Sequence, residues 1–353
     1  MKPQSNLNRL VIVLTLHIYP DQLKFKYPFA IATGMRENTS VVYVELKFEN
    51  LTGYGEAALP DYLPETQESV IDFLCRLNLQ QFTRAEDTEK ILDYIFSFTP
   101  RNYPAIAALD MALHDLKGKI LGKPCHSIFG LDKNKCPETS FTIGMDSREM
   151  ILKKSAEAKD FNLLKVKLGG SSDKMIIEAI RSVTDKPVCV DANQGWKAKE
   201  FALDMICWLK EQGTIFVEQP LDKNKIEDAL WLKEKSPLPV IADEAIQTFD
   251  DLEKIKDAYH GINIKLTKCG GMREAMKIIY RAKQLNLKIM LGCMSESSCG
   301  VSAAAQLAPL ADWADLDGPL LISNDPFHGI TYQKGKIILN DLPGNGVEKV
   351  EYL

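Results

Sequence analysis

Residues 187–191 (PVCVD), 214–218 (TIFVE) and 239–243 (PVIAD) are three short apolar runs, and each ends in a single acid. The acids are Asp191, Glu218 and Asp243, and a spacing of roughly 25 residues suits one strand and one helix per repeat. Such a series predicts neighbouring parallel strands of an α/β fold. Reactive side chains project from the carboxyl ends of these strands, so the acids are expected at one rim.

Five further β-branched runs flank these three and alternate with amphipathic stretches. Eight strands separated by helices predict a closed barrel of the TIM type, which we expect to be the catalytic domain at residues 126–320. The five runs are Ser140–Ile143, Leu163–Leu168, Gly261–Leu266, Lys288–Leu291 and Trp313–Leu316.

The two ends of the chain have a different character. Residues 1–125 combine β-rich segments at Leu10–Ile18 and Val41–Phe48 with a predicted helix at Tyr103–Leu121, where apolar residues recur every three or four positions. After residue 320 the sequence returns to short strands and turns. We expect an α+β capping domain at 1–125 and a C-terminal segment, 321–353, that packs back on it.

The composition excludes several classes of function. The chain has 353 residues and a formal net charge of −5, which gives no reason to expect nucleic acid or an anionic membrane as partner. No stretch approaches the roughly 20 apolar residues that span a bilayer. With its polar start, the chain is expected in the cytoplasm. Eight cysteines without a C-x-x-C pair predict free thiols.

The three acids predict a metal site. Clustered carboxylates repel one another unless a cation neutralises them. Oxygen ligands, with positions left for water and substrate, suit Mg²⁺. The alternative is that each acid only caps the helix that follows its strand. Three such acids in succession, each directly after an apolar run, favour the metal.

Three lysines are expected beside this site. Alternation along a strand sends Lys165 and Lys167 to the same side, and Lys268 enters from the sixth strand, across the barrel. Two lysines on opposite faces of a bound carboxylate could exchange an α-proton, one removing it and the other delivering one. Lys165 would instead neutralise the substrate carboxylate. The alternative is that these are solvated rim lysines.

The ordered motifs K-x-K, D-A-N, E-Q-P, A-D-E and K-x-x-K-x-G-G resemble those of the enolase superfamily, muconate-lactonizing subgroup. The resemblance extends to Gly53-Tyr-Gly-Glu56 and implies a (β/α)₇β barrel with a capping domain formed by both chain termini. It implies one Mg²⁺ per subunit and a homo-oligomer. By this resemblance Asp191, Glu218 and Asp243 hold the metal, and Lys167 and Lys268 are the two bases.

The eighth strand resembles that of dipeptide epimerases. There, a D-x-D element corresponding to Asp315 and Asp317 holds the substrate's ammonium group, while Thr142 and Ser297 match substrate contacts. The alternative for the two acids is an ion pair with a rim lysine. An o-succinylbenzoate synthase or N-acylamino acid racemase would have no ammonium for them to hold. A catalytically inactive binding protein and a Schiff-base aldolase are the alternatives outside this chemistry.

The loop after the first strand predicts the substrate side chain. Members of this family that act on Ala-Glu usually carry an arginine there, and this chain has Thr33, followed by Met35 and Arg36. A neutral pocket predicts an Ala-Xaa dipeptide whose Xaa is small or hydrophobic, such as Ala-Ala with D- or L-Ala first. If Arg36 takes the arginine's place, the alternative is an L-Ala-D/L-Glu epimerase of cell-wall peptide metabolism.

Overall fold

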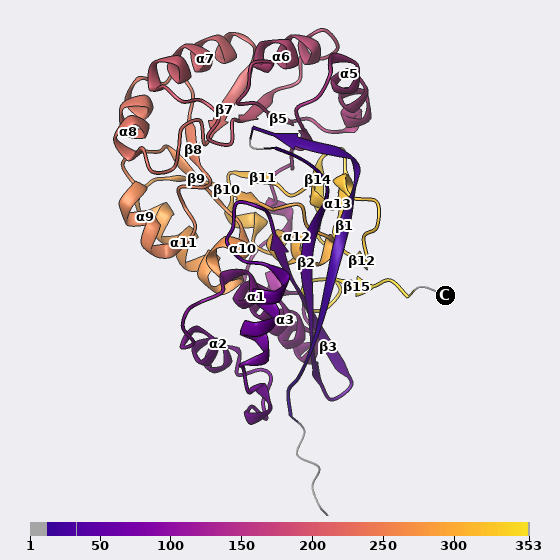
Figure 1. Cartoon of the computed structure of the whole chain (residues 1–353). Helices are drawn as coiled ribbons and strands as arrows, with labels where there is room; N and C mark the ends of the chain where they lie inside the picture. The colour runs from indigo at the N-terminus through magenta and orange to yellow at the C-terminus, as the bar shows by residue number, and fades with distance from the viewer. Residues whose placement is uncertain (1–12, 33, 352–353) are drawn as a thin grey trace, which may run out of the picture.

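The computed structural model of the chain describes residues 13–32 and 34–351. Figure 1 shows an antiparallel sheet with helices beside a ring of strands and helices. The antiparallel sheet has the order β1-β2-β3, and the second sheet is eight-stranded, with the order β11-β10-β9-β8-β7-β6-β5-β4. Among the described residues, no helix has the length and apolar character needed to cross a bilayer.

The capping domain is built from long strands and a central helix. The strands are β1 (Thr15–Ile31), β2 (Gly34–Phe48) and β3 (Leu51–Leu59), and the helices are α1 (Gln67–Cys75), α2 (Thr88–Phe96) and α3 (Tyr103–Leu121). The Asn102 side chain caps α3 by accepting from the Ala105 amide, and Gly122, at φ 62°, ends it. A Cβ on Gly55 would lie 1.9 Å from the Ala108 carbonyl oxygen, so glycine allows α3 to lie directly on β3.

The barrel strands are all parallel and follow one another in chain order. Its first and last strands also meet, because the Ser140 amide donates to the Ala314 carbonyl at 3.1 Å. The predicted barrel with a capping domain is therefore confirmed. The strands are β4 (Phe141–Ile143), β5 (Leu164–Lys167), β6 (Val188–Asp191), β7 (Thr214–Glu218), β8 (Val240–Ala242), β9 (Gly261–Ile264), β10 (Lys288–Gly292) and β11 (Trp313–Asp315).

Helices surround this barrel and bury their apolar faces against the strands. Their buried residues and the outward-facing residues of the strands, such as Val166 and Val190, form one core. The helices are α4 (Cys125–Ile128), α5 (Arg148–Glu157), α6 (Asp173–Arg181), α7 (Lys199–Glu211), α8 (Ile226–Lys235), α9 (Phe249–Ile255), α10 (Leu266–Cys269), α11 (Met272–Gln284), α12 (Ser298–Ala305) and α13 (Gly318–Leu321).

The first strand is longer than the sequence predicts. The prediction ended at Ile18, but β1 continues to Ile31 and pairs with β2 in a hairpin that reaches the barrel rim. The extension carries exposed polar residues, including Asp21 and Lys24, so its apolar signal is weak. The register shifts between Lys24 and Phe29. The start of the predicted segment lies outside the described residues.

The C-terminal segment contacts both parts of the molecule. Lys349 forms an ion pair with Glu45 of β2 at 2.7 Å, and Ile322 makes a β-bridge with Phe25 of β1. The hairpin of β13 (Thr331–Gln333) and β14 (Lys336–Ile338) lies on the barrel side, where Lys336 bridges to Glu138. The remaining strands, β12 (Phe327–His328) and β15 (Glu348–Lys349), pair with each other.

Candidate active site

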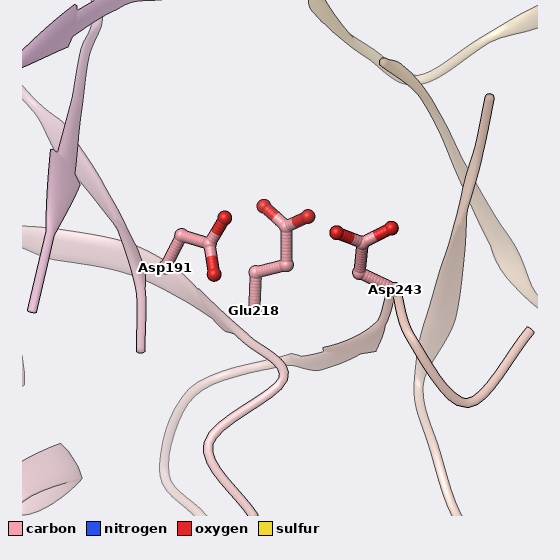
Figure 2. A group of neighbouring side chains, drawn as sticks. All are labelled: Asp191, Glu218 and Asp243. Carbon is pink, nitrogen blue, oxygen red and sulfur yellow. The ribbon is translucent and has the colours of Figure 1, made fainter. Parts of the chain in front are cut away.

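Three carboxylates meet at one end of the barrel, as Figure 2 shows. Asp191 and Glu218 are the last residues of β6 and β7 and are register partners, and Asp243 directly follows β8. One oxygen from each lies within 4.8 Å of the others, and all three residues are buried. Their shared position follows from the parallel register, because strands of matched length end at the same rim.

Four lysines surround the three carboxylates. On one side, Lys165 Nζ lies 2.6 Å from Glu218 Oε2 and 3.2 Å from Asp191 Oδ2, while Lys167 Nζ lies 2.5 Å from Asp191 Oδ2. On the other side, both Lys265 and Lys268 pair with Asp243, at 2.8 and 2.5 Å. The lysines thus supply positive charge to the cluster from two opposite directions.

The pKa values of the acids diverge because of these contacts. Burial opposes ionisation of Asp191, but Lys167 and Lys165 outweigh it and lower its pKa to about 2. Lys265 and Lys268 likewise hold the pKa of Asp243 well below its usual value against its burial. Burial and the charge of Asp191 raise the pKa of Glu218 to about 8. Added positive charge at the cluster would favour ionisation of all three.

The donor set fits a divalent cation. The three acids offer only carboxylate oxygens, which are the ligands that Mg²⁺ prefers. Asn263 fixes one oxygen of Glu218 with a 2.6 Å hydrogen bond. The other oxygen, although close to Lys165, accepts no hydrogen bond of acceptable geometry from the described residues. That oxygen is therefore available to a cation.

Lys167 and Lys268 lie on opposite sides of the carboxylates, as the sequence predicts, but Lys268 comes from a helix and not from a strand. Lys165 and Lys167 face the acids from β5, while Val166 lies in the core outside the strands. Lys268 is not on a strand but in the short helix α10, where its ammonium donates to the carbonyls of Asp243 and Asn263. Burial lowers the pKa of Lys268.

Asp315 and Asp317 form the opposite wall with Thr142. Lys165 Nζ lies 2.6 Å from Asp315 Oδ2, so the alternative given for the two acids, an ion pair with a lysine, holds for Asp315. The pair forms because the Lys165 side chain is long enough to reach β11. Asp317 instead accepts from the amide of Thr142 at 2.6 Å and from its hydroxyl at 3.2 Å.

Asp317 has hydrogen bonds from Thr142 but no cation in direct contact. Burial and the neighbouring charge of Asp315 raise the pKa of Asp317 to about 7. No ion pair to Asp317 occurs within residues 13–32 and 34–351. An ammonium group from outside the chain would satisfy this carboxylate.

A pocket joins the two walls and reaches the capping domain. Its lining includes Thr142, Lys167, Asp243, Asp315 and Asp317 from the barrel. Ser297 is not part of this lining. It is buried, and its hydroxyl and amide donate to Glu56 of β3 at 2.5 and 3.1 Å. The structure therefore places Ser297 at the junction of the two domains.

The capping domain contributes Arg36 and Tyr62 to the same pocket. Arg36 pairs with Asp61 at 3.7 Å, and its buried Nη1 donates no hydrogen bond to any described residue. The prediction of a neutral pocket is therefore wrong, because the hairpin turns Arg36 inward. Met35 is 68% exposed, and Thr33 lies outside the described residues.

The lining residues that received no role from the sequence include Lys265, Asn193 and Tyr62. Lys265 was visible in the K-x-x-K motif directly after an apolar run, and Asn193 in the D-A-N motif. Tyr62 had no signal, since it follows β3 in the capping domain and reaches the barrel only in the fold. Its hydroxyl lies 3.2 Å from Met294 Sδ.

Comparisons with known proteins agree with this architecture. Residues 13–130 match the mandelate racemase/muconate lactonizing enzyme N-terminal domain, and residues 150–352 match the enolase C-terminal domain-like family. An L-Ala-D/L-Glu epimerase of Bacteroides thetaiotaomicron is 52% identical over 96% of this chain and 88% of its own length. An L-Ala-D/L-amino acid epimerase of Pedosphaera parvula is 37% identical over 94% and 97%.

Solved structures show the same likeness. A dipeptide epimerase from Cytophaga hutchinsonii, complexed with Mg and D-Ala-L-Val, superimposes with a TM-score of 0.87 at 28% identity, covering 97% of both chains. Sequence match and shared architecture thus extend over nearly the whole chain. This chain belongs to the enolase superfamily and, within its mandelate racemase/muconate lactonizing enzyme group, to the dipeptide epimerase family of isomerases.

Proposed function

We propose that the chain is a Mg²⁺-dependent dipeptide epimerase that inverts the α-carbon of the C-terminal residue. The observation that carries this proposal is the position of Lys167 and Lys268 on opposite sides of the carboxylate cluster. An α-carbon held between them presents one face to each ammonium or amine. Inversion then requires one lysine to take a proton and the other to give one.

The proposed reaction is a 1,1-proton transfer. In one direction the neutral amine of Lys167 accepts the α-proton. The C–H electron pair becomes the double bond between the α-carbon and the carboxylate carbon, the C=O π pair moves onto oxygen, and an enediolate forms. The Lys268 ammonium then donates its proton to the opposite face, and the reverse direction exchanges the two roles. Burial lowers the pKa of Lys268, which makes its neutral form more accessible near neutral pH.

Asp191, Glu218 and Asp243 would hold the metal, one ion per subunit. When bound, the ion supplies positive charge beside the substrate carboxylate. Lys165 adjoins the same space and adds to the stabilisation of the developing negative charge. Since Lys165 also holds Asp315, it links the carboxylate end of the site to the opposite wall.

The free ammonium of the first residue would bind at Asp317 with Thr142 beside it. This end of the site favours a dipeptide over an N-acylamino acid or a succinylbenzoate, because those compounds lack an ammonium. A buried carboxylate without a cationic partner is costly, and a charge-assisted hydrogen bond from the substrate would relieve that cost.

The second residue of the substrate is best assigned as acidic, Ala-Glu or a close analogue. Arg36 lines the pocket on the capping side, and its present partner, Asp61, is mostly exposed. Such an exposed pair is weak, so a substrate carboxylate could take the place of Asp61. The L-Ala-D/L-Glu epimerase relative supports the same assignment. A cytoplasmic location, a homo-oligomeric state and a role in cell-wall peptide metabolism stay predictions.

A dipeptide library tests this function. Ala-Xaa compounds are incubated with the enzyme and Mg²⁺ in D₂O, and deuterium at each α-carbon is read by mass spectrometry. We expect label only at the second α-carbon, with Ala-Glu ahead of Ala-Val and Ala-Ala. Exchange in N-acetylamino acids but in no free dipeptide would refute the proposal.

A further inference from the structure

A second hollow lies beside the active-site pocket, between the capping hairpin and the barrel. It has a volume of about 260 Å³ and is lined mainly by aromatic and aliphatic side chains. In Figure 1 the bend of β1 passes close to α5, where Tyr27 hydrogen-bonds to Glu157, and the hollow lies at this junction. The residues that distinguish it from the active-site pocket include Phe25, Tyr27, Phe141, Phe161 and Leu320.

The two hollows share three lining residues, Phe29, Thr142 and Leu321. Thr142 is also the residue whose amide and hydroxyl hold Asp317. The aromatic hollow therefore begins beside the carboxylate that we assign to the substrate's ammonium. Its position is on the β4 side of the site, whereas Arg36 and Tyr62 line the active-site pocket from the capping loops.

The walls of this hollow are held in place by their own contacts. Phe25 stacks on Phe29 with ring centroids 5.5 Å apart, and Phe141 lies 5.1 Å from Phe161. The hydroxyl of Tyr27 donates to Glu157 at 2.6 Å, which ties the hairpin to α5. A preformed apolar site of this kind binds without a large ordering penalty.

Three charged residues belong to the lining, and none leaves a free charge inside the hollow. Lys154 forms an ion pair with Asp146 at 2.9 Å, Glu157 accepts the hydrogen bond from Tyr27, and Lys26 is exposed to solvent. The remaining lining is dominated by rings and by leucine. The chemistry of the hollow thus suits an uncharged apolar or aromatic group.

We propose that this aromatic hollow is the subsite for the side chain of the first residue of the dipeptide. The inference rests on the proposed function. In a dipeptide the first α-carbon bears both the ammonium and the side chain. If the ammonium binds at Asp317, the first atoms of that side chain therefore lie next to Thr142. The subsite would accept leucine- or phenylalanine-sized groups, and the enzyme would not be restricted to alanine in first position.

The test compares dipeptides that differ in their first residue and share the same second residue. Initial rates are measured for Ala-Glu, Leu-Glu and Phe-Glu with the wild-type enzyme, Leu320→Trp, which fills the hollow, and Leu320→Ala, which enlarges it. Leu320 lines only the aromatic hollow. Leu230→Trp, at an exposed leucine of α8, is the matched control. Thermal melting of each variant checks that it is folded.

We expect measurable wild-type turnover of Leu-Glu and Phe-Glu. Leu320→Trp should lower the ratio of kcat/KM for Leu-Glu over Ala-Glu by about tenfold or more, since steric and methylene-scale mismatches are worth about 10–200-fold. Leu320→Ala should raise the Phe-Glu to Leu-Glu ratio, and Leu230→Trp should keep both wild-type ratios. If Leu320→Trp does not fold, the Leu320→Ala ratio decides.

Two failures are distinguishable. Epimerisation of Ala-Glu with ratios that no Leu320 variant changes, or with no turnover of longer first residues, would overturn the subsite alone. Absence of exchange in every dipeptide, Ala-Glu included, would overturn the proposed function and the subsite together.

Discussion

The barrel rim and the capping loops line the same pocket with very different degrees of constraint. On the rim, buried acids and lysines pair at 2.5 to 3.2 Å, and Asp191 and Glu218 are each held by strand register. On the cap, Arg36 has one ion-pair partner at 3.7 Å, and that partner, Asp61, has an 80% exposed side chain. The rim is therefore suited to fixed chemistry, and the cap to substrate choice that can change without disturbing it.

The largest effect is expected when a metal ligand on the rim is replaced. Asp191→Asn, Glu218→Gln and Asp243→Asn should each abolish epimerisation, by on the order of 10³-fold or more, because metal charge stabilisation contributes several kcal/mol. Deuterium exchange with Ala-Glu measures the loss, and Mg²⁺ titration calorimetry measures the binding. Asp250→Asn, at an exposed acid of α9, is the control. Full turnover after exhaustive chelation would contradict the assignment.

The next largest effect is expected at the two bases. Lys167→Ala and Lys268→Ala should each stop net inversion, with losses of about 10²–10⁴-fold, because general acid–base catalysis contributes in that range. Each variant should still exchange deuterium into one epimer through the lysine that remains. Mass spectrometry of separate epimers checks this, with the exposed Lys277→Ala as control. Equal exchange of both epimers by both variants would exclude the two-base model.

Substitution of Asp317 should lower activity less than substitution of the bases, because Asp317 is assigned only to binding the substrate's ammonium. Asp317→Asn should lower kcat/KM for Ala-Glu by about 10–100-fold, since a hydrogen bond to a charged group contributes about 1.5–3 kcal/mol. It should also narrow the preference for Ala-Glu over N-acetyl-Ala-Glu. The comparison of both substrates with both enzymes measures this. A wild-type preference for the acetylated compound would reject the dipeptide assignment.

The pH dependence of kcat/KM should report on the ionisation of Asp317. Burial and Asp315 raise the pKa of Asp317 to about 7, and only its ionised form attracts an ammonium. As the pH falls through this value the carboxylate is protonated, so kcat/KM should decrease by about tenfold per pH unit below it. Profiles of the wild-type enzyme and Asp317→Asn from about pH 5.5 to about pH 8 test this. The limb near pH 7 should be absent from the variant; its persistence would assign it to another group.

The smallest effect is expected on the cap. Arg36→Gln should lower the ratio of kcat/KM for Ala-Glu over Ala-Gln by about fivefold, because part-exposed ion pairs contribute up to about 1 kcal/mol. Turnover of Ala-Gln should change less, since the barrel rim is untouched. Glu37→Gln, an exposed charge on the same hairpin, is the control. An unchanged ratio would show that Arg36 does not select the substrate side chain.

The sequence alone was sufficient to locate the barrel and the carboxylate cluster. Each acid directly follows an apolar run, and the parallel register brings runs of equal length to one rim. The same argument placed Lys165 and Lys167 on the inner side of β5, because side-chain alternation is a local property. These features depend on short-range order and on one repeated unit.

Other features depend on contacts between distant segments, and only the tertiary structure decided them. Lys165 and Asp315 are 150 residues apart, and whether they pair depends on how the barrel closes. Arg36 lines the pocket because the whole β1–β2 hairpin reaches the rim, although the strand signal of the outer part of β1 is weak. Ser297 looked like a substrate contact, but Glu56 from the capping domain holds it at the domain junction. Local periodicity does not predict which capping loop contacts which side of the pocket, because packing between the two domains determines these contacts.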